Sequence, residues 1–146
     1  MNNRHYWLYW FITDLFLGVG LLYQSEFLYA AMLTVVIHSI HFMIWSPHIA
    51  SFPMQVRIGY LALLVIGQLP YCRWINWIQL IGTTALLTVD YCPLARILSL
   101  MPWNRVQPLS FNYFKRAVLS MPVNGSIIQH LSPELVAKRH PELKVA

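Results

Sequence analysis

The stretch Phe27–Trp45, FLYAAMLTVVIHSIHFMIW, contains no acidic residue, lysine or arginine. A helix needs about 20 consecutive apolar residues to cross a bilayer. The whole chain has the same character: 58% of its 146 residues are hydrophobic, only 10% are charged, and its mean hydropathy is +0.52. Because a small soluble domain leaves a large fraction of its chain exposed to water, we expect an integral membrane protein.

Three further apolar segments give the chain the pattern of four membrane-crossing helices. Polar or proline-containing breaks separate the segments, since proline lacks the amide donor that a helix interior needs. Aromatic residues crowd the segment ends, as in an interfacial belt. Short connections require neighbouring helices to be antiparallel. We therefore expect residues 1–91 to form an all-α, up-down bundle of four transmembrane helices at about Tyr6–Tyr23, Phe27–Trp45, Val56–Tyr71 and Trp74–Val89.

Residues 92–146 are expected to form a basic cytoplasmic or interfacial tail with short amphipathic surface helices. Pro93–Met101 carries apolar residues at helical spacing, and Phe111–Leu119 follows Ser110, a residue type that favours a helix N-cap. A last helix is predicted to begin at Ser132. The helix predicted at Phe111–Leu119 has three apolar residues on one face, namely Phe111, Phe114 and Val118. Basic surface helices bind anionic lipid headgroups, which we expect as partners of this tail beside the bilayer itself.

The lysine and arginine residues predict the orientation of the bundle. All of the 10 except Arg73 lie on the side that holds the N-terminus, the second connection and the tail. Because cytoplasmic loops carry an excess of Lys and Arg, we expect both termini in the cytoplasm, with the bundle in a bacterial-type inner (plasma) membrane. The net charge of +5 does not indicate nucleic-acid binding, since no basic helix with interleaved base-reading residues is present.

Asp14, His38 and His41 form a candidate intramembrane polar site. A charged group at the centre of a span costs about 2.5–3.5 kcal/mol on insertion scales and usually marks a site or a partner. Measured from the segment ends at 1.5 Å per residue, Asp14 lies about 12 Å deep and His38 about 10 Å deep. Antiparallel helices would therefore place Asp14 beside His38. His41 shares a helix face with His38, because the two are three positions apart.

Several interpretations of this group stay open. A carboxylate and two histidines are a known ligand set for transition metals, so the three residues are weak candidates for a metal site. A proton-handling or quinone-contacting role is a second interpretation. The favoured one is a structural, hydrogen-bonded group between helices. Haem is disfavoured because no histidine lies on the other three segments. The cofactor is unknown, and the expectation is that there is none.

Charged residues near the segment ends can be paired by side. Glu26 and Arg73 fall on the predicted outer face, and Arg57, Asp90 and Arg96 fall on the inner face. We expect structural ion pairs among them, of the weak kind found at partly exposed positions.

The two cysteines, Cys72 and Cys92, have no zinc-site or disulfide-framework spacing. Cys72 ends the third segment and Cys92 follows the fourth, so the membrane should separate them and prevent a disulfide between them. Cys92 has no sequence neighbour that would activate it as a nucleophile, and His48 is the residue that the fold would have to bring near it for such a role. No phosphate-binding loop or hydrolase motif is present.

The stretch Thr83–Leu100, TTALLTVDYCPLARILSL, resembles the end of small bacterial inner-membrane domains of unknown function, some of which accompany rhodanese domains. In those domains a transmembrane helix reaches an aromatic-Cys-Pro-Leu turn and then a short apolar stretch. The matching residues here are Tyr91, Cys92, Pro93 and Leu94. Those domains usually have two spans and a glycine-rich pattern before the turn, where this chain has Thr88-Val89-Asp90. The resemblance implies a bacterial inner-membrane protein and carries no catalytic residue across.

The leading functional hypothesis is a non-catalytic accessory or assembly subunit of a larger membrane complex, whose partners are other membrane protein subunits. One alternative is a metal, redox or proton-handling site built on Asp14, His38 and His41. A second alternative is a small transporter, which would need water-lined polar residues on several spans. An enzymatic activity is the less favoured expectation.

Overall fold

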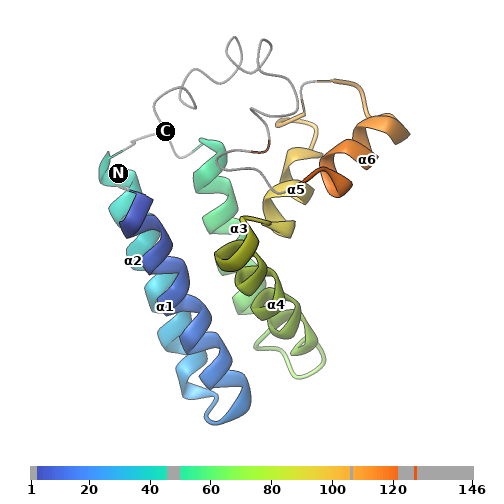
Figure 1. Cartoon of the computed structure of the whole chain (residues 1–146). Coiled ribbons are helices and arrows are strands. Elements are labelled where there is room, and N and C mark those ends of the chain that lie inside the picture. Colours follow the sequence, from blue (N-terminus) through green and yellow to red (C-terminus); the bar gives the residue numbers. More distant parts are fainter. Residues whose placement is uncertain (1–2, 46–49, 106, 122–126, 128–146) are drawn as a thin grey trace.

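The computed structural model describes residues 3–45, 50–105, 107–121 and 127. This part of the chain is entirely helical and contains no strand, which confirms the all-α prediction (Figure 1). The helices are α1 (Asn3–Leu22), α2 (Glu26–Trp45), α3 (Phe52–Ile66), α4 (Trp74–Val89), α5 (Pro93–Ser99) and α6 (Phe111–Leu119). Their bounds agree with the predicted segments to within a few residues.

The four longer helices pack in cyclic order, because α1 contacts α2 and α4, and α3 also contacts α2 and α4. Each is antiparallel to its neighbours in sequence. Tyr9 lies against His41 while Gly20 lies against Leu28, so α2 returns along α1. Two hairpins, α1–α2 and α3–α4, therefore stand side by side, with their connecting turns at the same end of the molecule (Figure 1).

The α1–α2 turn is short and tightly hydrogen-bonded. The amides of Tyr23 and Gln24 both donate to the carbonyl of Val19, at 2.9 and 3.3 Å, and the amide of Phe27 donates to the carbonyl of Gln24. The two helices consequently start in close contact. Gly20 is buried at this point, and a side chain there would meet Leu28.

The chain turns sharply after α4. The axes of α4 and α5 differ by 97°, and Asp90 between them has φ 54°, the left-handed conformation. The thiol of Cys92 accepts a hydrogen bond from the amide of Ala95 at 3.4 Å and so caps α5. Pro93 occupies the first turn of α5, where its missing amide hydrogen has no cost. The aromatic-Cys-Pro-Leu segment is thus a capped helix–helix corner.

The tail helices predicted at Pro93 and Phe111 are present as α5 and α6. Helix α6 has the predicted bounds, and Ser110 caps it by accepting from the amide of Tyr113 at 3.2 Å. Its buried residues are Tyr113 and Ala117, whereas Phe111 and Phe114 are exposed. Packing against α5 uses the side opposite the aromatic stripe. The helix predicted from Ser132 lies outside the described residues.

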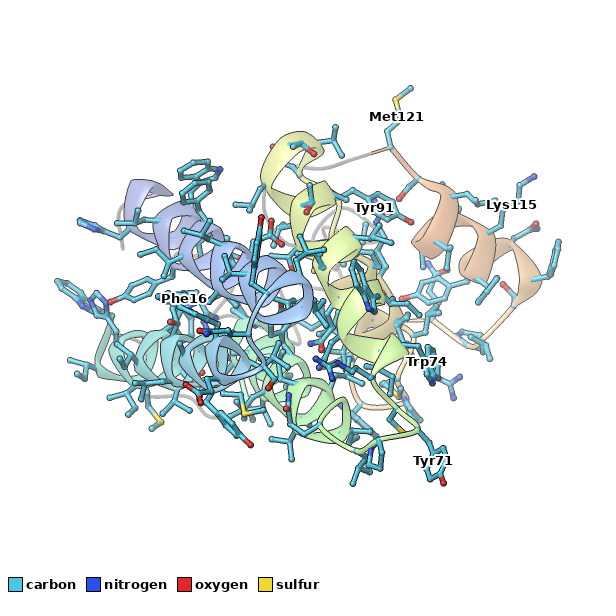
Figure 2. The ribbon with its side chains drawn as sticks, turned by 90° about the horizontal axis from the view of Figure 1, so that it is seen from below. Phe16, Tyr71, Trp74, Tyr91, Lys115 and Met121 are labelled. Atoms are coloured by element: carbon cyan, nitrogen blue, oxygen red, sulfur yellow. The ribbon has the colours of Figure 1, made fainter. Side chains whose placement is uncertain are left out.

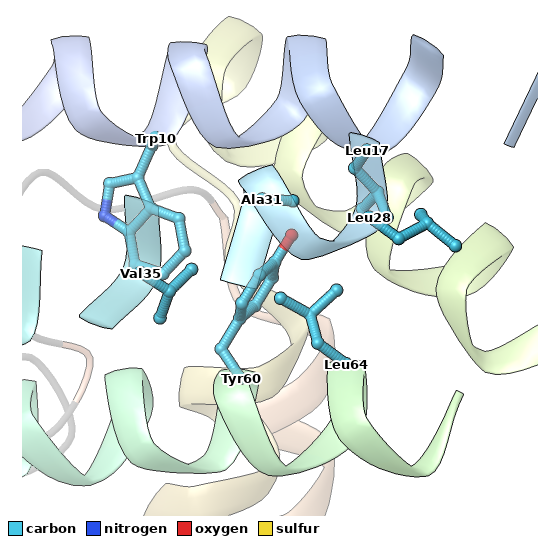
Figure 3. Packing of buried hydrophobic residues seen from close by; sticks show 7 residues of the cluster. All are labelled: Trp10, Leu17, Leu28, Ala31, Val35, Tyr60 and Leu64. Carbon is cyan, nitrogen blue, oxygen red and sulfur yellow. The ribbon is translucent and has the colours of Figure 1, made fainter. Parts of the chain in front are cut away.

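The apolar core is small and lies between α1, α2 and α3 (Figure 3). It consists of Trp10, Leu17, Leu28, Ala31, Val35, Tyr60 and Leu64. Many large apolar side chains of the four longer helices point outward instead, among them Leu15, Leu33, Ile40, Ile44, Val65 and Ile81. Burial inside the chain therefore accounts for only part of its hydrophobicity.

Helix length and hydropathy support fewer crossings than the predicted four. Among the described residues, α2 alone is long and apolar enough to span a membrane, and 28% of its most apolar stretch is buried. The bent pair of α4 and α5 would add one span if it counted as a single crossing. Helices α3 and α4 have 15 and 16 residues, or about 22 and 24 Å at 1.5 Å per residue. The tyrosines and tryptophans of α1, together with Asp14, lower its hydropathy.

The close approach of α1 and α2 can be tested at Gly20. In Gly20→Ala the new Cβ would lie 2.7 Å from Leu28 Cδ2 and 2.9 Å from the Leu28 backbone nitrogen, so we expect a loss of about 1–3 kcal/mol in the free energy of unfolding. Gly18→Ala is the control, because its Cβ would meet Leu80 Cδ1 at an ordinary 3.6 Å. Thermal unfolding followed by tryptophan fluorescence should separate the two variants. Equal melting temperatures would contradict the observed packing.

Candidate functional site

A buried arginine–histidine pair connects α2 to α3. Arg57 and His38 are each only 1% exposed. Nη2 of Arg57 lies 3.1 Å from Nε2 of His38, and Nη1 of Arg57 donates to the carbonyl of Pro53 at 2.7 Å. A guanidinium has donors only, so Nε2 of His38 accepts and the imidazole carries its proton on Nδ1. His38 is therefore neutral in this pair.

Aromatic side chains of α1 surround the imidazole of His38. Tyr9 stacks on it with ring centroids 4.6 Å apart. Tyr6 and Trp10 meet it edge-on at 5.7 and 5.5 Å. The aromatic residues at the start of the first segment, predicted to form an interfacial belt, thus also build the wall of an internal polar site.

The guanidinium of Arg57 is enclosed by aromatic rings as well. It lies 4.0 Å from the ring centroid of Phe42 and 5.5 Å from that of Tyr6. Such contacts attract a cation by about 2 kcal/mol or more when water is excluded. Arg57 was expected at the inner interface, in a group with Asp90 and Arg96 that forms structural ion pairs. The structure instead places it inside the bundle, solvated by an imidazole, a carbonyl and π faces.

His41 occupies a separate position one turn beyond His38. Its Nδ1 lies 2.9 Å from the hydroxyl of Tyr9, and its ring meets the ring of Tyr9 edge-on at 5.6 Å. The side chain is half-buried. Tyr9 thus stacks on one histidine and hydrogen-bonds the other, so the two histidines share a neighbour.

Asp14 does not meet His38. Its Oδ2 accepts a hydrogen bond from the hydroxyl of Thr84 on α4 at 3.1 Å. The depth estimate failed because it counted from assumed membrane boundaries, whereas the short α1–α2 turn fixes the alignment of the two helices. His38 contacts Trp10, which is one helical turn, or about 6 Å, before Asp14 on α1.

The three predicted site residues therefore make separate contacts: His38 with Arg57, His41 with Tyr9, and Asp14 with Thr84. Within the described ranges, no group of three or more His, Cys, Asp or Glu side chains is placed to hold a metal ion. Nε2 of His38, its usual ligand atom, already accepts from Arg57. This geometry does not fit a metal centre shared by Asp14, His38 and His41.

A second polar network joins α3 to α4. The hydroxyl of Tyr60 lies 2.8 Å from Oγ1 of Thr83, which donates to the carbonyl of Gln79 at 2.7 Å. Nε2 of Gln79 donates to the carbonyl of Tyr60 at 2.9 Å, and Nδ2 of Asn76 donates to that of Gly67. Sequence reasoning missed this network. Its signal is the spacing of Asn76, Gln79 and Thr83, which places all three on one helix face.

Arg96 is the second buried arginine, and it holds α6 in place. Nη1 donates to the carbonyl of Ala117 and to Oγ of Ser120, both at 2.8 Å, and Nη2 donates to the carbonyl of Met121 at 3.0 Å. A cation at this position also complements the negative end of the α6 dipole. The guanidinium covers the ring of Tyr91 at 4.2 Å, a residue that Figure 2 shows between α4 and α6. Arg96 therefore caps the C-terminal end of α6 and does not have the interfacial role predicted from the sequence.

The remaining predicted interface charges are exposed. Glu26 begins α2 and Arg73 precedes α4, so both lie at the end of the bundle that carries the two short turns. Asp90 is exposed at the α4–α5 corner. Their proposed pairing remains a prediction.

Cys92 has a structural role in the corner after α4. Burial raises the pKa of its thiol above the usual value, although the hydrogen bond from the Ala95 amide partly opposes this shift. The thiolate is the nucleophilic form of cysteine, so a raised pKa disfavours nucleophilic chemistry here. His48, considered as an activating partner, lies outside the described residues.

Comparison with protein-family models, curated proteins and solved structures finds no match to this chain. The contacts and exposures of its own side chains therefore carry the functional proposal. Two features of those contacts bear on function. The buried polar groups bind to one another, and the outer surface is apolar.

The Arg57–His38 pair can be tested by a double-mutant cycle. His38→Ala leaves the buried guanidinium without its acceptor, so we expect a loss of about 3–5 kcal/mol in the free energy of unfolding. Arg57→Met removes the charge, and the double variant should then lose less than the sum, with a coupling of about 1–3 kcal/mol. Denaturant unfolding followed by circular dichroism measures each value.

His41→Ala is the matched control for that cycle. It removes one half-buried hydrogen bond to Tyr9, which is worth about 1 kcal/mol. Its effect should add to that of Arg57→Met, since the two side chains share no hydrogen bond. Additive losses in the His38 cycle would contradict the pair.

Proposed function

We propose that this chain is a small multi-pass protein of a bacterial-type inner (plasma) membrane, with four crossings and both termini in the cytoplasm. We further propose that it acts as a non-catalytic accessory or assembly subunit of a larger membrane complex. The observation that carries the proposal is the apolar outer surface of the bundle. Large apolar side chains cover it, whereas polar and charged side chains are buried beside the apolar core.

The contrast is clearest in α4, whose buried side chains Asn76, Gln79 and Thr83 are all polar. On α2 and α3, His38 and Arg57 are buried beside apolar residues. The outward side chains of these three helices are large and apolar, including Tyr29, Leu33, Ile37, Ile58, Ile78 and Ile81. Exposed apolar surface of this extent marks a membrane or protein interface in soluble monomers. A hydrocarbon environment removes the cost of exposing this apolar surface to water, and it strengthens the hydrogen bonds inside the bundle.

The short helices α3 and α4 are compatible with crossing. Aromatic and basic residues at their ends can extend a short span, and the bilayer can thin locally, at a cost of fractions of a kcal/mol per ångström of mismatch. Tyr71, Trp74 and Trp77 are exposed at one end of these helices, and Figure 2 shows Tyr71 and Trp74 projecting from the bundle. Amphipathic rings at this position suit the headgroup region.

Helix α6 supports contact with the membrane surface. Phe111 is 81% exposed and Phe114 is also exposed, while Lys115 and Arg116 on the same helix are exposed cations. An apolar stripe beside basic residues is the pattern of a helix that lies among anionic headgroups. We propose these headgroups as partners of the tail.

A structural role fits the interior better than catalysis or transport. The buried polar side chains form hydrogen bonds that tie helix to helix, as in the pairs Arg57–His38 and Tyr60–Thr83. A cavity of about 100 Å³ lies between α3, α4 and α5. Its lining is almost entirely apolar and includes Val56, Leu63, Leu94 and Ile97. A transport path would need a polar, water-lined route instead.

The orientation can be tested with single cysteines at two highly exposed positions. Tyr71 is 91% exposed in the α3–α4 connection, and Met121 is 84% exposed after α6. In a background with Cys72→Ser and Cys92→Ser, a membrane-impermeant maleimide should label Tyr71→Cys in intact cells. Met121→Cys should be labelled only after permeabilisation. Labelling of both positions from the same side would contradict the proposed topology.

The subunit role predicts the behaviour of the protein in mild detergent. Purified from its native membranes, it should elute in a complex with other membrane chains, and it should aggregate when detergent is withdrawn, because its outer surface is apolar. Size-exclusion chromatography with mass measurement checks both. A monodisperse protein in plain buffer would overturn the membrane assignment. A lone monomer with a defined enzymatic or transport activity would overturn the accessory role.

A further inference from the structure

The α1–α4 seam carries polar groups on the outer surface of the bundle. Thr84 and Thr88 are exposed on α4, one turn apart, and Asp14 is half-exposed on α1 beside Thr84. Around them the surface is formed by large apolar side chains such as Leu15 and Ile81. This patch of Asp14, Thr84 and Thr88, here named the seam patch, is out of place on a surface that faces lipid.

The antiparallel packing of the two helices fixes the position of the seam patch. Nε1 of Trp7 donates to the carbonyl of Leu87 at 3.5 Å, and Gly18 faces Leu80. The Asp14–Thr84 contact lies between these two. Asp14 is therefore near the middle of α1 in the chain and near the middle of the seam in space, at a depth where no headgroup or bulk water reaches it.

The hydrogen bonds of Asp14 are incomplete. Oδ2 accepts from the Thr84 hydroxyl, yet that same hydroxyl also lies 2.9 Å from the carbonyl of Leu80 and has only one hydrogen to give. Oδ1 is buried and has no hydrogen-bond partner among the described residues. An ionised carboxylate offers about four acceptor sites. Asp14 thus has spare acceptor capacity in a place where an unpaired carboxylate is costly.

The rest of the bundle does not provide a cation at this depth. Helices α2 and α4 contain no lysine or arginine. Arg57 of α3 is buried in its own pair with His38, and Arg4 lies about 15 Å before Asp14 along α1 at 1.5 Å per residue. A second copy of this chain would bring the same composition to the interface. Charge complementarity therefore favours a different chain.

We propose that the seam patch is the docking site for a transmembrane helix of another protein, and that this helix carries a lysine or arginine opposite Asp14. The basic side chain donates to the half-exposed carboxylate of Asp14. The hydroxyl oxygens of Thr84 and Thr88, whose hydrogens are directed to acceptors within the chain, accept further interhelical hydrogen bonds. This inference rests on the proposed function and names the surface by which the subunit joins its complex. Paired opposite charges are the usual way in which ionisable residues are tolerated in membranes.

The probe for the test is a synthetic transmembrane peptide of leucine and alanine with one central lysine. The matched peptide has leucine at that position. The protein, labelled at Tyr71→Cys in the background without Cys72 and Cys92, is reconstituted with each peptide in phosphatidylcholine vesicles, and association is measured by energy transfer. The lysine peptide should bind roughly tenfold more tightly than the leucine peptide.

Asp14→Asn keeps the size of the side chain and should abolish this preference, whereas Glu26→Gln, at an exposed helix end, should leave it unchanged. Asp14→Lys should instead favour a peptide with a central glutamate, and this gain excludes simple misfolding. Equal binding of both peptides to the unsubstituted protein would overturn the proposal. So would energy transfer between copies of this chain that depends on Asp14.

Failure of this inference can be distinguished from failure of the proposed function. If the reconstituted protein shows the expected labelling of Tyr71→Cys and Met121→Cys but ignores the peptide charge, the docking site is wrong and the membrane assignment stands. If the labelling itself fails, the proposed function is wrong.

Discussion

The guanidinium of Arg57 must be solvated by the protein, because it is almost fully removed from the surface. The chain meets most of this demand without a described carboxylate: His38 accepts through Nε2, Pro53 accepts through its carbonyl, and Phe42 and Tyr6 supply π faces. Nε of Arg57 has no hydrogen-bond partner among the described residues. Burial of an unpaired charge is costly, so these contacts constrain the alignment of α1, α2 and α3 together. The aromatic packing around His38 and the core beside it depend on the same alignment.

Helix positions were predictable from the sequence because apolar runs and proline-containing breaks are local signals. The α1–α4 segments and the Ser110 cap of α6 were found in this way. The alignment of two helices along their axes is not a local property, since it depends on how many residues form the turn between them. The hydrogen bonds of Tyr23 and Gln24 to Val19 shorten that turn. His38 therefore lies beside Trp10, about one helical turn from Asp14, and the two predicted partners do not meet.

The interfacial assignments of Arg57 and Arg96 were wrong for a related reason. Arg57 and Arg96 were placed at an interface because a position near a segment end suggests exposure. Sequence distance from a segment end does not report which face of a helix packs inward, and both arginines point toward another element of the chain. The buried face of α4 was available from the spacing of Asn76, Gln79 and Thr83, yet amide and hydroxyl side chains on an apolar helix do not by themselves distinguish a helix–helix contact from a polar pore.

Among the described residues, the two buried arginines also link the bundle to α6. Arg57 fixes the helices below the α4–α5 corner, and Arg96 binds the carbonyl groups at the end of α6 just beyond it. Tyr91 at the corner donates to the carbonyl of Val118 and lies under the guanidinium of Arg96. The aromatic stripe and cations of α6 are therefore held at a set angle to the bundle. In the proposed membrane arrangement, this angle would decide which face of α6 meets the headgroup layer, so the contacts of Arg96 would link the orientation of the bundle to that of the surface helix.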